Sequence, residues 1–182
     1  MKETMVIILT VLILAGCRKE YNREEDNENE LITTIILSTT ETGSSDTLDY
    51  VWEDVDGPGG TDPDIDTIAL EHGKNYDISL SLLDKTKIPF ENITTEIEEE
   101  SNVHRFYLQP DGGTGITISD PDEDIDGLTL GLHNKLNTNQ PATGHISITL
   151  RHYPDGGKTE EDAVNSPKST TDAEAIFPVV VK

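Results

Sequence analysis

Residues 75–84 read NYDISLSLLD, and this stretch has the clearest alternation of apolar and polar side chains in the sequence. Apolar side chains occupy every second position from Tyr76 to Leu82, with an aspartate and two serines between them. A period of two predicts a β-strand that turns one face to a core and the other to solvent. The stretch therefore predicts a sheet with one buried face.

Similar short runs recur on both sides of this stretch, separated by Gly, Pro and Asp. The expected strands lie at residues 31–38, 48–53, 65–70, 76–82, 103–108, 116–119, 128–132, 144–150 and 175–181. This spacing predicts an all-β domain over residues 31–182, an antiparallel immunoglobulin-like β-sandwich of about nine strands. The side chains expected in its core include Trp52, Tyr76, Ile78, Leu80 and Leu82.

Residues 92–100, NITTEIEEE, depart from the period of two. Ile93 and Ile97 stand four positions apart, which is helical spacing, and glutamates follow at once. Either Thr94 or Thr95 is available as an N-cap. We expect one short helix here, crossing between the sheets.

The charge of the chain excludes one class of partner. Its 182 residues carry 36 Asp and Glu against 13 Lys and Arg, a formal net charge of −23 at pH 7. Nucleic acid would be repelled, because no basic patch is large enough to release counterions from phosphates.

The N-terminus predicts a lipoprotein. Residues 5–15, MVIILTVLILA, form an apolar run whose helix would rise about 16 Å, roughly half of a bilayer core. The run ends in Leu-Ala-Gly-Cys, and Cys17 is the only cysteine. Small residues before a cysteine let a membrane peptidase bind the extended backbone, and the cysteine thiol is the nucleophile that becomes lipidated. We expect residues 1–16 to be a signal peptide and Cys17 to be lipidated.

Residues 17–30 continue as an acidic tether without aliphatic side chains. The anchor predicts an outer-membrane location. Whether the domain faces the periplasm or the cell surface is left open, because an acidic run after the cysteine fits both an export signal and an ordinary linker.

Two histidines are candidates for a metal site. His104 opens the expected strand VHRFY and follows three glutamates, and His152 closes the strand ISITLRH. Two imidazoles at strand ends, with an acid such as Glu99, could hold zinc or copper. Protons should compete for such a site as the pH falls through about 6.5.

Calcium is the alternative metal. Residues 119–127, SDPDEDIDG, place Asp120, Asp122, Asp124 and Asp126 at every second position before a glycine. Calcium prefers oxygen ligands in such a loop, but the twelfth position from Asp122 is a histidine, where an EF-hand has glutamate. A looser calcium loop and a solvated acidic turn both stay open.

Catalysis has little support in the sequence. The chain has no G-x-S-x-G motif, and lipidation of Cys17 would leave no free thiol. Residues 57–60, GPGG, lie among acids that would repel a phosphate. We expect no enzymatic activity.

Several segments together resemble a group of small Bacteroidota lipoproteins. They are WEDVDGPGG, NYDISLSLLD, NITTEIEEESNVHRFY, DPDEDIDGLTLGL and GHISITLRHYPDGGK, within residues 30 to 182. The most specific parts are the E-I-x-E-E segment before His104 and the L-R-H-x-P segment that ends at Pro154. The group bears the name type 1 periplasmic binding fold superfamily, yet that fold has two α/β lobes, which the period of this chain does not predict.

The resemblance implies an envelope lipoprotein found beside TonB-dependent receptors. The expected function is non-enzymatic: an accessory that binds a ligand or metal for TonB-dependent uptake. A structural or adhesive surface domain without a specific small ligand is the alternative.

Overall fold

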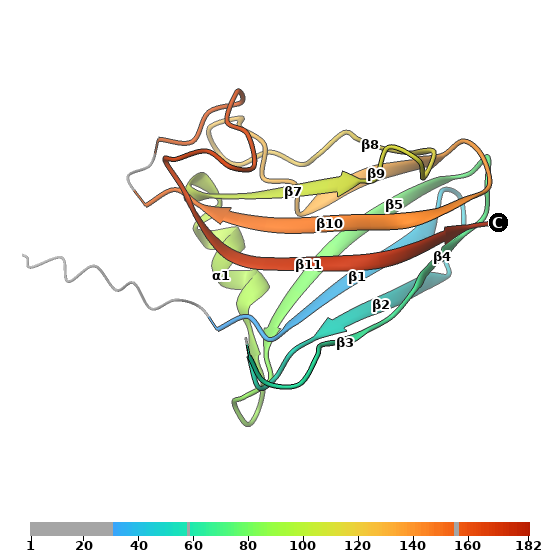
Figure 1. The fold of residues 1–182 in the computed structure, drawn as a ribbon. Coiled ribbons are helices and arrows are strands. Elements are labelled where there is room, and N and C mark those ends of the chain that lie inside the picture. Colours follow the sequence, from blue (N-terminus) through green and yellow to red (C-terminus); the bar gives the residue numbers. More distant parts are fainter. Residues whose placement is uncertain (1–30, 58, 155–156) are drawn as a thin grey trace, which may run out of the picture.

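The computed structural model describes residues 31–57, 59–154 and 157–182. The expected signal peptide, Cys17 and the tether lie outside the described residues. Within them the chain forms eleven strands, one α-helix and one 3-10 helix (Figure 1). No helix in these ranges is long and apolar enough to cross a membrane. The all-β prediction is confirmed, but the expected nine strands are too few.

Seven strands form the larger sheet. They are β1 (Thr34–Glu41), β2 (Thr47–Glu53), β3 (Asp64–Ile65), β5 (Asn75–Asp84), β6 (Glu91–Asn92), β8 (Ile116–Ser119) and β9 (His133–Thr138). Their order is β3-β2-β1-β5-β9-β8, and β6 pairs with the end of β5. All neighbours are antiparallel.

Four strands form the smaller sheet. They are β4 (Ile68–Leu70), β7 (His104–Pro110), β10 (Ala142–His152) and β11 (Thr170–Val181), in the order β4-β11-β10-β7. The β4 strand runs parallel to β11, which corrects the expectation of a wholly antiparallel fold. The strand expected at residues 65–70 is divided, because β3 joins the larger sheet and β4 the smaller one.

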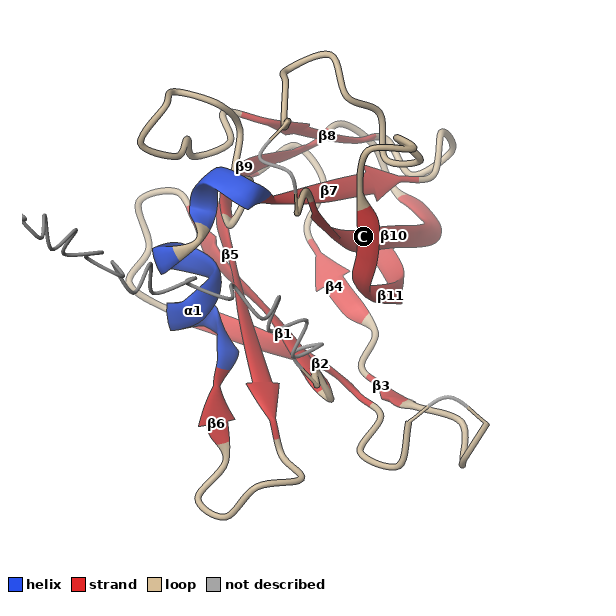
Figure 2. Cartoon of the chain, turned by 90° about the vertical axis from the view of Figure 1, so that its left-hand side faces the viewer, coloured by secondary structure: helices blue, strands red, loops and turns tan. Residues whose placement is uncertain are grey.

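The two sheets lie on opposite sides of one core (Figure 2). The expected face of β5 is buried from Tyr76 to Leu82. Trp52 is only partly buried, which corrects the prediction that it lies in the core. Its strand lies near the sheet edge, where only the two-residue β3 pairs beyond it.

The short helix α1 (Ile93–Glu99) forms where the sequence predicts it, and both of its isoleucines are buried. Its N-cap is Asn92, whose side-chain oxygen accepts a hydrogen bond from the Thr94 amide at 3.1 Å. Neither expected threonine is the cap. The Thr94 hydroxyl instead accepts a hydrogen bond from the Leu82 amide at 2.8 Å, which fixes the helix to β5.

Residues 128–132 do not form the expected strand. Leu130 and Leu132 are buried, but Gly131 between them has a φ of +78°. A β-carbon at Gly131 would lie 2.9 Å from the Phe106 carbonyl oxygen, so glycine also permits the close approach to β7. The only β-pairing of this segment among the described residues is an isolated bridge between Glu123 and Thr129, so the alternation here reflects burial in the core.

The β9 strand is absent from the sequence-based expectation because polar side chains occupy two of its inward positions. Asn134 and Thr138 are both buried there. The Asn134 side chain donates to the Gly131 carbonyl at 2.7 Å, and the Thr138 hydroxyl donates to the Glu71 carbonyl at 2.7 Å. Internal hydrogen bonds therefore replace apolar contacts along this strand.

A substitution in β5 tests the core. Leu80 is 2% exposed. Leu80→Ala should lower the free energy of unfolding by about 2–5 kcal/mol, because it removes buried methyl groups and leaves a cavity. Urea titration measures the loss, and Ser79→Ala on the opposite face of the strand should change it by less than about 0.5 kcal/mol. A similarly small loss for Leu80→Ala would contradict the assignment of this face.

Candidate metal centre

The smaller sheet brings His104 and His152 together. His104 is the first residue of β7, His152 is the last of β10, and the two are direct cross-strand partners. Their ring centroids lie 4.8 Å apart, with an angle of 24° between the ring planes. His104 is 2% exposed, whereas His152 is partly buried. The cross-strand pairing thus joins two histidines that are far apart in the sequence.

The carboxylate beside this pair belongs to Asp172, not to Glu99. Asp172 lies in β11, at the point where its register with β10 shifts between Leu150 and Arg151. Leu150 pairs with Ala173 and Arg151 with Thr171, so Asp172 is the extra residue of a β-bulge. A bulge redirects the side chain of its extra residue. Glu99, at the end of α1, is exposed and is not part of the group.

The three side chains form a compact set of ligands. One ligand atom from each of His104, His152 and Asp172 lies within 4.8 Å of the others, the only such group in the described residues. His104 Nε2 and Asp172 Oδ2 are 3.7 Å apart. That separation is too long for a hydrogen bond. It is close to the roughly 3.3 Å that separates two ligands of a tetrahedral zinc ion.

A hydrogen bond fixes the tautomer of His104. Its Nδ1 lies 3.1 Å from the Glu100 carbonyl oxygen. A carbonyl oxygen can only accept, so Nδ1 carries the proton. Burial lowers the pKa of His104 to about 4, and the neighbouring His152 and Lys158 add to this against the effect of the Glu100 hydrogen bond. The ring is therefore neutral at pH 7, and Nε2 presents a lone pair.

Asp172 has an incompletely paired carboxylate. Its Oδ2 atom is buried and has no hydrogen-bond partner among the described residues. Burial raises the pKa of Asp172 to about 6, although the charges of His152 and Arg151 act in the opposite direction. At pH 7 an ionised oxygen therefore faces the bare Nε2 of His104. Two electron-pair donors without a proton between them are the arrangement that a metal cation would satisfy.

The four aspartates of the alternative calcium loop lie elsewhere. Asp124 is buried, and its Oδ1 accepts hydrogen bonds from the Asp126 and Leu128 amides at 2.8 and 2.9 Å. Its Oδ2 lies 2.6 Å from Nζ of Lys158, whose side chain is also buried. An ammonium group of the chain therefore occupies the cation position beside the most buried aspartate of the loop.

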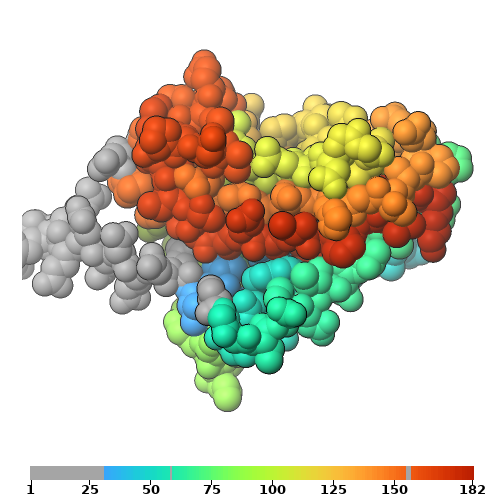
Figure 3. Space-filling model, in the orientation of Figure 1, coloured from blue at the N-terminus to red at the C-terminus, as the bar shows by residue number. Residues whose placement is uncertain are grey.

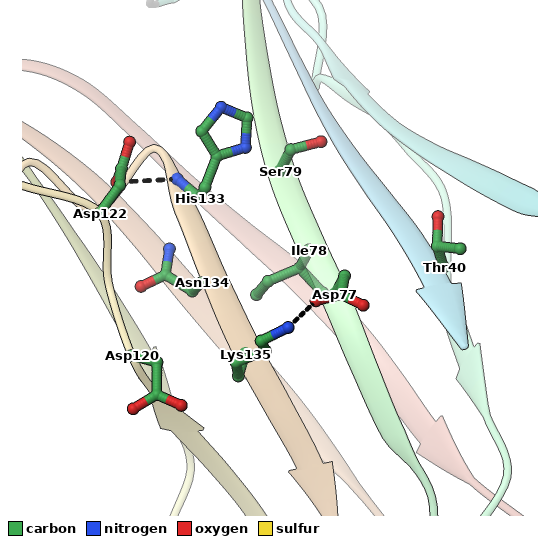
Figure 4. A pocket seen from close by; sticks show the side chains of 9 residues that line it. All are labelled: Thr40, Asp77, Ile78, Ser79, Asp120, Asp122, His133, Asn134 and Lys135. Atoms are coloured by element: carbon green, nitrogen blue, oxygen red, sulfur yellow. Dashed lines mark hydrogen bonds and ion pairs between the residues drawn. The ribbon is translucent and has the colours of Figure 1, made fainter. Parts of the chain in front are cut away.

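Asp120 and Asp122 line an open hollow of about 330 Å³ on the outer face of the larger sheet (Figure 4). The Asp122 carboxylate accepts a hydrogen bond from the His133 amide at 2.9 Å. Across the hollow, Lys135 forms an ion pair with Asp77. Two of the three carboxylates that line this hollow are thus paired with groups of the chain itself.

Comparison with known proteins adds no assignment. No protein-family model matches the chain, and no curated protein and no solved structure matches it either.

Proposed function

We propose that this protein is a non-enzymatic lipoprotein of the cell envelope that binds a divalent metal ion at His104, His152 and Asp172. One observation carries the metal-binding part: the bare Nε2 of His104 faces a buried Asp172 oxygen that has no hydrogen-bond donor among the described residues. An unpaired buried carboxylate costs free energy, and a bound cation would remove that cost.

The donor set favours zinc or copper over calcium. Two imidazole nitrogens and one carboxylate oxygen suit these ions, whereas calcium prefers six to eight oxygens. Three protein ligands leave a coordination position for water or a transferred ligand. His152 and Asp172 are partly exposed, so an ion could enter and leave from their side. A site for reversible binding is consistent with these features.

The envelope location rests on the sequence. The apolar run before Leu-Ala-Gly-Cys supports lipidation at Cys17 and attachment to the outer membrane. The resemblance to lipoproteins encoded beside TonB-dependent receptors supports a role in metal or nutrient uptake. We propose that an immunoglobulin-like arrangement of the two sheets holds the metal centre at one end. A structural or adhesive domain is the alternative function.

Thermal unfolding with and without metal tests the proposal. Zinc at about 100 times its dissociation constant should stabilise the folded protein by about 2.7 kcal/mol, because it binds only the native state. Calcium at the same concentration should give no comparable shift. The protein is purified without a histidine tag, and metal analysis then identifies any ion retained. If no transition metal changes the melting temperature, the structural alternative is favoured.

A further inference from the structure

The turn between β5 and β6 forms an apolar tip. Residues 85–90 read KTKIPF, and within them Ile88 is 99% exposed and Phe90 is 61% exposed. In the space-filling view the turn projects as a light green knob below the rest of the molecule (Figure 3). Exposed large apolar side chains that lie together on a protruding turn make it a candidate contact site.

The tip lies beside the point at which the described chain begins. The Thr33 amide donates to the Leu83 carbonyl at 3.0 Å, and the Lys85 amide donates to the Thr33 hydroxyl at 2.8 Å. The base of the tip is therefore hydrogen-bonded to the residue that follows the expected tether almost directly. A chain held to a membrane through Cys17 would enter the domain at this end.

Other exposed apolar side chains gather at the same end. The Thr33 carbonyl accepts a hydrogen bond from the Asp54 amide at 2.8 Å, which places Val55 here as well. Val55 is 44% exposed, and Leu31, at the start of the described chain, is 52% exposed. Four of the seven large exposed apolar side chains in the described residues thus flank this end: Leu31, Val55, Ile88 and Phe90.

The charge of the tip differs from that of the chain as a whole. Residues 85–90 contain two lysines and no acid, in a protein with a net charge of −23. Lys85 forms an ion pair with Glu53, and Lys87 with Glu91. Lys87 also lies 3.7 Å from Asp84, so the acids beside the tip outnumber its two lysines by one, and the excess negative charge at the tip is small. The tip also projects farther than the acidic loop that follows β2, which keeps those carboxylates away from a surface that the tip touches (Figure 3).

We propose that Ile88 and Phe90 insert into the interface of the lipid bilayer that holds the anchor at Cys17. This inference rests on the lipoprotein part of the proposed function. Two apolar side chains bind a bilayer weakly alone, because interfacial affinity scales with the apolar area that is buried. Only 13 residues, 18–30, separate Cys17 from the start of the described chain, so an anchor at Cys17 would keep the tip close to the membrane surface and raise its effective concentration there. Together the anchor and the tip orient the domain on the membrane.

Tryptophan fluorescence tests the tip in the full lipidated chain. The protein is reconstituted into phosphatidylcholine vesicles, and wild type, with Trp52 as its one tryptophan, gives the baseline. Phe90→Trp should add emission that brominated phospholipid quenches by about half, since an inserted residue lies within the depth that such lipids reach. Leu48→Trp is the matched control, because Leu48 is 59% exposed at the opposite end of β2. Its added emission should stay unquenched.

The outcomes distinguish the tip proposal from the lipoprotein proposal. Cys17→Ser should release the protein from the membrane fraction after a carbonate wash. If that variant is released but the added emission of lipidated Phe90→Trp is not quenched, the tip proposal is wrong and the lipoprotein proposal stands. If Cys17→Ser remains in the membrane fraction, both fail. Blue-shifted added emission from Phe90→Trp in the Cys17→Ser background without vesicles would show that the chain itself covers the tip, which also overturns the proposal.

Discussion

Replacing His104 or His152 with alanine should reduce the zinc affinity of the protein by at least about 100-fold, and the double variant should bind no zinc detectably. The estimate follows from the three-ligand geometry, because outer-shell partners of metal ligands alone contribute about 10- to 100-fold. Isothermal calorimetry on metal-free protein at pH 7.5 is the measurement. Unchanged zinc binding by the double variant would rule out this metal centre.

Asp172 and Glu99 provide a matched pair of substitutions at this site. Asp172→Asn keeps the shape of the side chain but removes the charge that faces His104 Nε2, so zinc binding should fall as it does for the histidine variants. Glu99→Gln should leave zinc affinity unchanged, since Glu99 is exposed and outside the ligand group. The opposite result would restore Glu99 as the carboxylate ligand.

The stability of the metal-free protein distinguishes a metal-binding role of Asp172 from a purely structural role. Burial raises the pKa of Asp172, so the ionised carboxylate destabilises the folded state above about pH 6. Asp172→Asn should therefore leave the metal-free protein as stable as wild type at pH 7.5, or more stable. A marked loss of stability would mean that the carboxylate has a partner within the chain.

As the pH is lowered, zinc affinity should fall first because Asp172 is protonated, and only at lower pH because His104 is protonated. Zinc affinity should begin to fall as the pH drops through about 6, where a proton competes for Asp172. His104 takes up a proton only near pH 4, because burial lowers its pKa, and the fall should steepen there. This differs from the expectation that protons compete for the imidazoles as the pH falls through about 6.5, and the measured profile distinguishes the two. When zinc affinity is measured by calorimetry as a function of pH, the Asp172→Asn variant should lack the fall near pH 6.

The sequence predicts those parts of the fold in which burial and strand pairing coincide. From Tyr76 to Leu82 every second side chain is apolar and buried, and the strand forms as expected. In β9 the inward positions of Asn134 and Thr138 are polar, because their hydrogen bonds are made to backbone groups outside the strand. Alternation of apolar residues cannot reveal such a strand.

The candidate metal centre shows the same limit. His104 and His152 are candidates from the sequence because they lie at the ends of expected strands. The pairing of β7 with β10 places them opposite each other. Asp172 has no signal in the sequence, because a register shift between β10 and β11 turns its side chain toward them. Glu99 is near His104 in sequence but lies on a helix that ends in solvent. Closeness along the chain therefore indicated Glu99, whereas the structure places Asp172 beside the two histidines.

Lys158→Met should lower the free energy of unfolding by about 3–5 kcal/mol, because it removes one partner of a buried ion pair. The Lys158 ammonium lies 2.6 Å from Asp124 Oδ2, and both side chains are almost fully buried. It also donates to the backbone carbonyl oxygens of Ser101, His104 and Thr129, at 2.8 to 3.2 Å. Methionine fills a similar volume but leaves the carboxylate without its cationic partner and three carbonyl groups without this donor. Urea unfolding at pH 7 measures the loss.

A double variant distinguishes the ion pair from simple packing. Burial alone would raise the pKa of Asp124, but the Lys158 ammonium beside it, with two backbone amides, holds that pKa below its ordinary value. In the Lys158→Met background, Asp124→Asn should recover about 0.5–3 kcal/mol, because it removes the stranded charge while its side-chain oxygen can still accept from the amides. Lys168→Met is the surface control, since Lys168 is half-exposed beside Asp162, and it should cost no more than about 1 kcal/mol. If Lys158→Met costs no more than this control, the ammonium is not the cation that stabilises the acidic loop, and calcium becomes the better candidate for that position.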